Sequence, residues 1–175
     1  MSAADNTSQQ DEAEIRRLLA AWNAAFESRD VDALTANYLP VSILYDAIPP
    51  YKVVGRDSIR QFWGNILPHF PEKFQSEHRD LTIHVAGDVA LVHGLHHFLT
   101  TPVDHPCGQT WVRRTIGFRR IDGKWRVVHE HVSLPHNPAS NQTWTIKDPN
   151  VVDVPDEGWQ PVEKLDQQLQ KGKNT

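Results

Sequence analysis

A single carboxylate interrupts an otherwise apolar segment of the chain. Asp46 lies in VSILYDAI (41–48), where most of the other side chains are apolar. A carboxyl group in such surroundings must find polar partners or shift its pKa, because desolvation disfavours the charged form. A raised pKa suits a group that accepts a carbon-bound proton near neutral pH, so Asp46 is a candidate general base. The alternative is structural: Asp46 ends the strand and caps a turn at Pro49-Pro50.

Histidine is the second potentially reactive residue type. Seven of the 10 histidines fall in the segments 73–86, 88–101 and 124–134. They are His78, His84, His93, His96, His97, His129 and His131. His129 and His131 alternate along one segment and would share a face of a strand, with other histidines opposite them. A metal-dependent enzyme is therefore one hypothesis, although histidines on strands are not by themselves a specific ligand motif.

Two helices, a hairpin and a third helix precede most of these histidines. Apolar residues at helical spacing predict helices over about residues 10–28, 31–38 and 59–67. Between the last two, an apolar strand (41–48) and a partner (51–54) predict a β-hairpin closed by the proline pair.

The second half of the chain reads as a meander of four strands. These cover about residues 73–86, 88–101, 109–121 and 124–134, and Asp122-Gly123 is a strong hairpin signal. Separate runs of helices and strands predict an α+β fold, with three N-terminal helices closing one face of a curved, mostly antiparallel sheet. Such a cone leaves a central pocket, where a ligand is expected.

Composition limits the partners of this domain. The 175 residues carry a formal net charge of −4, with acids and bases interspersed, and contain one cysteine, Cys107. We expect no nucleic-acid binding, because a basic patch is missing, and no membrane span, because no long apolar run exists. The single cysteine and the polar first residues favour a cytoplasmic protein without a disulfide framework.

The chain divides into three predicted parts. Residues 1–10 have little to bury and are expected to form a disordered arm. Residues 11–135 form the domain, and 136–175 form an irregular, proline-containing extension with a short helix near 161–170.

Two stretches of sequence resemble a known family. The segment RRTIGFRRIDGKWRVVHEHVS (113–133) is similar to the ending Arg-x-Thr, apolar strand, Asp-Gly-Lys/Arg-Trp and His-x-Ser of SnoaL-like proteins. Residues 30–63 resemble ketosteroid isomerases, also of the NTF2-like superfamily. The resemblance spans about residues 11–135 and implies an NTF2-like (cystatin-like) cone without metal or cofactor. It places Asp46 on the proton-shuttling base of the isomerases.

The departures from the isomerases concern the groups that stabilise an enolate. The isomerases stabilise the enolate with a tyrosine hydroxyl and a protonated aspartic acid. In this chain the position of the tyrosine holds Trp22, and the position of the aspartic acid falls near Arg114. Trp22 donates only through its indole N–H, while Arg114 could stabilise an anion as a permanent cation. On the family pattern His131 is the second catalytic candidate. The resemblance also implies a pocket lined by Trp22, Tyr38, Trp63 and Phe118, with His96 pointing inward; which face of 124–134 meets the pocket stays open.

These observations support three hypotheses. The first is a small cofactor-independent acid–base enzyme of isomerase, lyase or cyclase type, acting on a hydrophobic, aromatic or polycyclic molecule. The second is a non-catalytic module of the superfamily for ligand binding or oligomerisation, and the third is the metal-dependent enzyme. Apolar residues on both faces of 124–134 also predict a homodimer packed sheet to sheet.

Overall fold

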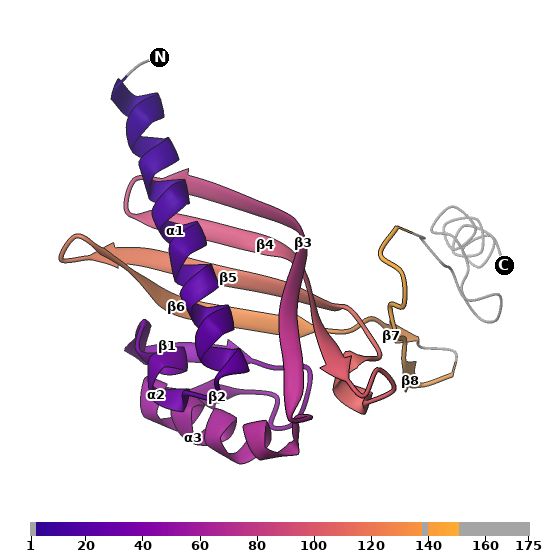
Figure 1. Ribbon diagram of the computed structural model, residues 1–175. Helices are drawn as coiled ribbons and strands as arrows, with labels where there is room; N and C mark the ends of the chain where they lie inside the picture. Colours follow the sequence, from indigo (N-terminus) through magenta and orange to yellow (C-terminus); the bar gives the residue numbers. More distant parts are fainter. Residues whose placement is uncertain (1–2, 138–139, 151–175) are drawn as a thin grey trace, which may run out of the picture.

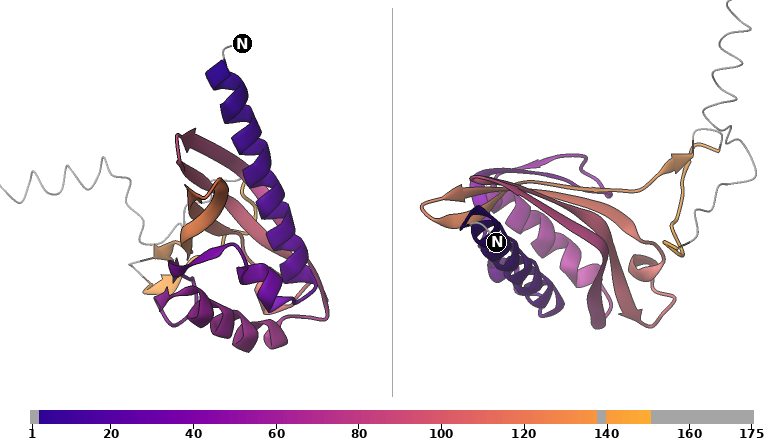
Figure 2. Two further views of the ribbon diagram at one scale, coloured as in Figure 1. Left: turned by 90° about the vertical axis from the view of Figure 1, so that its left-hand side faces the viewer. Right: turned by 90° about the horizontal axis from the view of Figure 1, so that it is seen from above.

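Helices on one side of a curved sheet form the architecture of the computed structural model, which describes residues 3–137 and 140–150. The sheet has six strands in the order β2-β1-β6-β5-β4-β3. Figure 1 shows α1 crossing the sheet, and Figure 2 shows α1 and α3 on the same side of it. The α+β cone expected from the sequence is confirmed. None of the helices in the described part of the chain is long and apolar enough to cross a membrane.

The first helix is longer than predicted. Helix α1 (Ala3–Glu27) includes most of the stretch 1–10, so the expectation of a disordered arm was wrong from Ala3 onward. No glycine or proline interrupts this stretch, and each further residue adds a hydrogen bond to an existing helix. Ile15 and Phe26 are fully buried on its inner face. Helix α2 (Val31–Thr35) follows, capped by the Asp30 side chain, which accepts from the Ala33 N–H at 2.9 Å.

Strand β1 (Tyr38–Tyr45) starts earlier than the sequence suggested. Tyr38 was expected at the end of the second helix, but it begins this strand. Long-range pairing overrides the helical pattern here, because β1 lies parallel to the last long strand and the Ser42 hydroxyl donates to the Val127 carbonyl at 2.6 Å. Asp46 directly follows the strand.

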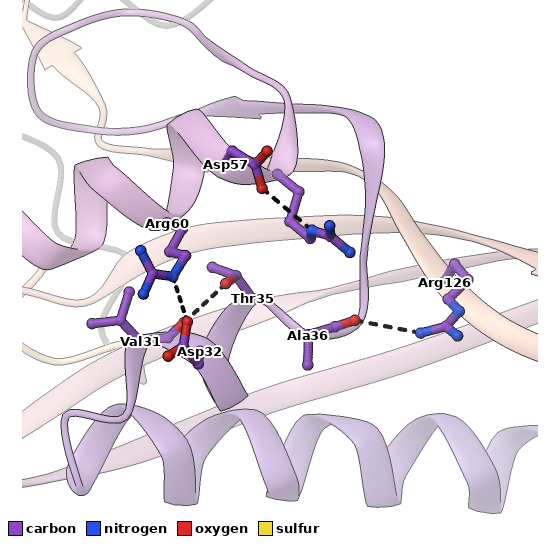
Figure 3. Close-up of polar contacts among 8 residues, drawn as sticks. Val31, Asp32, Thr35, Ala36, Asp57, Arg60 and Arg126 are labelled. Atoms are coloured by element: carbon purple, nitrogen blue, oxygen red, sulfur yellow. Dashed lines mark hydrogen bonds and ion pairs between the residues drawn. The ribbon is translucent and has the colours of Figure 1, made fainter.

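A short hairpin partner and the third helix complete the first half. Strand β2 (Val53–Val54) pairs antiparallel with β1, and α3 (Arg56–Ile66) follows, continued by the 3-10 turn η1 (Leu67–His69). An ion pair between Arg60 and Asp32 joins α3 to α2 (Figure 3).

The four-strand meander is confirmed. It consists of β3 (Lys73–Ala86), β4 (Val89–Thr101), β5 (Val112–Ile121) and β6 (Lys124–Ser133), with the 3-10 turn η2 (Pro106–Gly108) between β4 and β5. Beyond it lies a two-stranded ribbon, β7 (His136–Asn137) and β8 (Gln142–Thr143). The predicted helix near 161–170 lies outside the described residues.

A β-bulge in β6 decides which of its residues face the helices. Gly117 pairs with His129 but Phe118 pairs with Val127, so β6 contains one extra residue. Trp125 and Val127 are buried on the inner face before the bulge, and Glu130 is buried after it. The bulge thus turns Glu130 inward, and His129 and His131 to the other face.

Aromatic rings fill the core between α1, α3 and the sheet. The centroid of the Phe26 ring lies 5.0 Å from the ring centroid of Trp63, 5.1 Å from that of Phe98 and 5.5 Å from that of Phe74. These edge and stacked contacts join α1 to α3, β3 and β4 in one cluster.

An irregularity in β3 depends on a glycine in β4. The β3–β4 register shifts between Arg79 and Thr82, and a Cβ at Gly94 would lie 2.8 Å from the Arg79 carbonyl oxygen and 3.2 Å from Leu81 Cα. Both atoms belong to the backbone, so neither can move without distorting the strand.

We expect Gly94→Ala to lower the free energy of unfolding by about 1–3 kcal/mol, because the added methyl group overpacks this site. Gly64→Ala is the matched control: no atom lies within 4 Å of the added Cβ in the described structure, and alanine favours the helix by up to about 1 kcal/mol. Urea unfolding of both variants measures the difference, and equal stabilities would contradict the prediction.

Candidate active site

A cavity of about 430 Å³ lies between the helices and the sheet. Asp46, Trp22, Trp63, His96 and Arg114 line it, all five predicted from the sequence. The remaining walls are mostly apolar and come from α3, β4, β5, β6 and the segments that follow β1 and η2. They include Ile66, Phe70, Phe98, Val112, Val132 and Leu134.

Asp46 is both a turn residue and a cavity residue. Its carboxylate accepts the Ile48 N–H at 3.2 Å, which is the local turn contact expected of an aspartate at a strand end. Burial nevertheless raises the pKa of Asp46 from 3.8 to about 6, and the Glu130 carboxylate adds to the rise. The backbone hydrogen bonds and Arg114 oppose this shift. The two interpretations of Asp46 are therefore compatible.

A buried cluster of three side chains stands beside Asp46. Arg114 Nε donates to Glu130 Oε1 at 2.7 Å, and the Tyr38 hydroxyl donates to Glu130 Oε2. The exposed fractions are 5% for Arg114, 1% for Glu130 and 3% for Tyr38. Burial and the Glu130 carboxylate hold the pKa of the Tyr38 phenol well above its usual range, so it stays a donor. The Arg114 guanidinium also lies 3.8 Å from the centre of the Trp22 ring.

Glu130 is the central residue that the sequence prediction missed. An acid between Val128 and Val132 carried the same signal as Asp46: a carboxylate in an apolar strand. The sequence does not determine which face of that strand meets the pocket, because the bulge that decides it is not visible in the sequence.

Buried nitrogen atoms at the cavity lack partners. Trp63 Nε1, His96 Nε2 and Arg114 Nη1 have no hydrogen-bond partner among the described residues. Burial and the Arg114 charge hold the pKa of His96 well below its usual range, so its ring is neutral at neutral pH. The same two causes lower the pKa of His78, stacked on His96 at 4.7 Å, to about 4. A ligand with acceptor oxygens would satisfy these donors.

Three predicted site residues lie elsewhere. Tyr38 and Phe118 do not line this cavity but line a smaller one behind the Arg114 side chain. Phe118 lies outside the larger cavity because it is four residues along β5 from Arg114. Four residues of a strand span about 13 Å. His131 is exposed on the other face of β6 and shares only a shallow, open recess with Asp46. The bulge sets this direction, and the role of His131 as a second catalytic residue stays a prediction.

The histidines of the meander do not gather into a metal site. In residues 3–137 and 140–150, no group of three or more histidine, cysteine, aspartate or glutamate side chains could hold a metal ion. His129 Nδ1 instead contacts the Ile43 carbonyl at 2.9 Å, and His97 Nε2 contacts the Gly108 carbonyl at 2.8 Å. Both rings have structural partners in the backbone.

Comparison with known proteins places this geometry in a family. The family model described as the SnoaL-like domain matches residues 15–137. The chain belongs to the SnoaL-like family of the NTF2-like superfamily. Among curated protein sequences none matches.

Solved structures agree with this assignment. An NTF2-like protein of unknown function from Pseudomonas putida KT2440 shares 30% identity, with a TM-score of 0.75, over 81% of this chain and 99% of that one. A candidate dehydratase of the NTF2-like family from Streptomyces avermitilis has 23% identity and a TM-score of 0.62, over 71% of this chain and 96% of that one. A candidate aromatic ring hydroxylase from Novosphingobium aromaticivorans has 18% identity and a TM-score of 0.60, over 71% of this chain and 88% of that one. The last two show a shared fold.

The raised pKa of Asp46 predicts a pH-dependent effect of Asp46→Asn on stability. Ionised Asp46 disfavours the folded state, so the wild type loses stability as the pH rises from about 4 to about 6. Asparagine stays neutral and keeps the side-chain oxygen. We expect the variant to gain up to about 3 kcal/mol over the wild type above about pH 6 and little below pH 4, measured by urea unfolding. A pH-independent difference would contradict the burial of this charge.

The ion pair predicts strong coupling between Arg114 and Glu130. Glu130→Leu leaves the guanidinium buried without its partner, so we expect a loss of about 3–5 kcal/mol in unfolding free energy. Combining it with Arg114→Met removes both charges and should cost clearly less than the sum of the single changes. Glu12→Ala, which breaks the exposed Arg16 pair, is the control and should cost under about 1 kcal/mol. Additive single effects would show that the buried pair is not coupled.

Proposed function

We propose that the protein is a cofactor-independent acid–base enzyme, of isomerase, lyase or cyclase type, acting on a flat hydrophobic molecule that carries a carbonyl group. The observation that carries the proposal is one mostly apolar cavity holding a carboxyl group of raised pKa together with unpartnered N–H donors. A base and an oxyanion-stabilising group in one desolvated space are the two requirements for removing a proton next to a carbonyl.

Each residue has a role in the proposed first step. Asp46 takes a proton from the carbon next to the carbonyl. The C–H electron pair then forms the C=C bond of the enolate, and the π electrons of the carbonyl move to its oxygen. The resulting enolate oxygen accepts hydrogen bonds from His96 Nε2–H and Arg114 Nη1–H. A neutral His96 supports this role, because a weakly acidic donor does not lose its own proton to the oxyanion.

The second step sets the reaction type. Protonated Asp46 can return the proton to another carbon of the enolate, which is an isomerisation. Alternatively the enolate expels a group from the adjacent carbon, which is a lyase reaction. Trp22 and Trp63 form aromatic walls that suit a planar substrate. The volume of about 430 Å³ lies in the usual range of small-molecule sites.

We expect Asp46→Asn to bind substrate but to lose turnover by about a hundredfold or more, because asparagine cannot take the proton. Thermal-shift screening of both proteins against flat hydrophobic ketones, phenols and diols identifies ligands, since a bound ligand raises the melting temperature. Product analysis of each hit then measures turnover.

The control variant is Asp57→Asn, which changes an exposed aspartate of α3 outside the cavity and should leave turnover unchanged. The wild-type rate should rise with pH through a midpoint of about 6, as Asp46 becomes ionised. Turnover that survives in Asp46→Asn would reduce Asp46 to its role in the turn.

A second candidate function is assembly. The exposed side chains of Val89 (58%) and Leu91 (45%) alternate with buried Ala90 and Val92, so they lie on the sheet face that points away from the helices. We propose that two copies pack through this face. Light scattering that gives a monomer at micromolar concentration would remove this proposal, and a dimer without turnover of any hit would favour the assembly function.

A further inference from the structure

A second cavity lies behind the candidate active site. It measures about 240 Å³ and is bounded by α1, α2 and parts of β1, β5 and β6. We name it the rear cavity and the larger one the front cavity. The rear cavity is lined mainly by apolar side chains, among them Leu18, Leu34, Phe118 and Val127. Only Trp22 and Arg114 line both cavities among the described residues.

The buried ion-pair cluster separates the two cavities. Tyr38 lines the rear cavity, while Glu130, which accepts its hydrogen bond, lines the front cavity. Between them Arg114 lies over the Trp22 ring and donates to Glu130. A molecule in either cavity therefore touches the same two side chains, Trp22 and Arg114.

Polar side chains also line the rear cavity, namely Trp22, Asn37, Tyr38, Arg114 and Arg126. Among them, Asn37 carries an unpartnered side-chain donor and does not line the front cavity. The Nδ2 of Asn37 is buried and has no hydrogen-bond partner in the described part of the chain. The rest of Asn37 is fixed: its carbonyl accepts the Val127 N–H at 3.0 Å and its Oδ1 accepts Arg126 Nη1 at 3.4 Å. Arg126 Nη1 also donates to the Ala36 carbonyl, at the rim of the cavity (Figure 3). An unpartnered N–H donor beside an apolar space calls for an acceptor atom on the ligand.

We propose that the rear cavity is a second binding site, distinct from the front one, for a small apolar molecule with one acceptor oxygen, such as an aryl ketone. The size is sufficient, because a dry apolar cavity of about 150 Å³ already binds benzene. The ligand's ring packs between α1 and the sheet, and its oxygen accepts from Asn37 Nδ2. This inference goes beyond the proposed activity and does not depend on Asp46 acting as a base.

The test compares two probes of equal shape. Acetophenone carries the acceptor oxygen and ethylbenzene lacks it. Binding is followed by the NMR signals of the tryptophan indole N–H groups, assigned with Trp22→Phe and Trp63→Phe. Rear-cavity binding shifts the Trp22 signal, because Trp22 lines that cavity, and front-cavity binding shifts the Trp63 signal as well.

Two matched variants separate the cavities. Ala33→Phe obstructs the rear cavity and Ala47→Phe the front cavity, and both alanines are exposed residues at the edge of their cavity, so the fold should tolerate the change. We expect the acetophenone shift of Trp22 to persist in Ala47→Phe and to be lost in Ala33→Phe. Asn37→Leu should remove the preference for acetophenone over ethylbenzene, which we expect to be about tenfold in the wild type.

Three results would overturn the proposal. The first is a Trp22 shift that is lost in Ala47→Phe and kept in Ala33→Phe, which would place the only binding in the front cavity. The second is no Trp22 shift up to the solubility limit of acetophenone. The third is equal binding of the two probes, which would exclude the assigned ligand class. All three are read from binding alone, so they are independent of whether Asp46→Asn abolishes turnover.

Discussion

The buried contact between Arg114 and Glu130 is the constraint on which the site depends. A guanidinium and a carboxylate that are both at least 95% buried can persist only if each satisfies the other. Glu130 does so by accepting from Arg114 and Tyr38 at once. Arg114 keeps its contact with Trp22, and its Nη1 has no partner in the described part of the chain. Charge neutrality inside the domain is thus achieved while a donor is left over for a ligand.

The same contact explains the electrostatics of its neighbours. Burial lowers the pKa of His96 and His78, and the positive Arg114 guanidinium lowers it further, so both rings stay neutral. The loss of water favours the protonated form of Asp46, and the Glu130 carboxylate adds to this effect. Beside this ion pair the cavity holds the neutral His96 ring and the carboxyl group of Asp46 with its raised pKa, an environment in which a proton can move at moderate pH.

The sequence predicts what local signals determine. The four meander strands, the Asp122-Gly123 turn and the Asp30 cap follow from short-range patterns, and the structure confirms them. Asp46 could be singled out because a charge in an apolar strand is unusual at any register. The places of Tyr38, Glu130 and His131 could not be predicted, because they depend on the parallel pairing of β1 with β6 and on a one-residue bulge. Both features arise only from contacts between distant segments.

The parallel pairing of β1 with β6 also has a consequence for how the site forms. The contacts that hold it join residues 85 to 92 positions apart, from Ser42 to Val127, from Ile43 to His129 and from Tyr38 to Glu130. Contacts of such sequence separation are costly in loop-closure entropy and slow folding. During synthesis, a nascent chain that has not yet emerged beyond β5 contains Asp46 and Arg114 but not Glu130. The site is therefore assembled late, when the final long strand docks between β1 and β5.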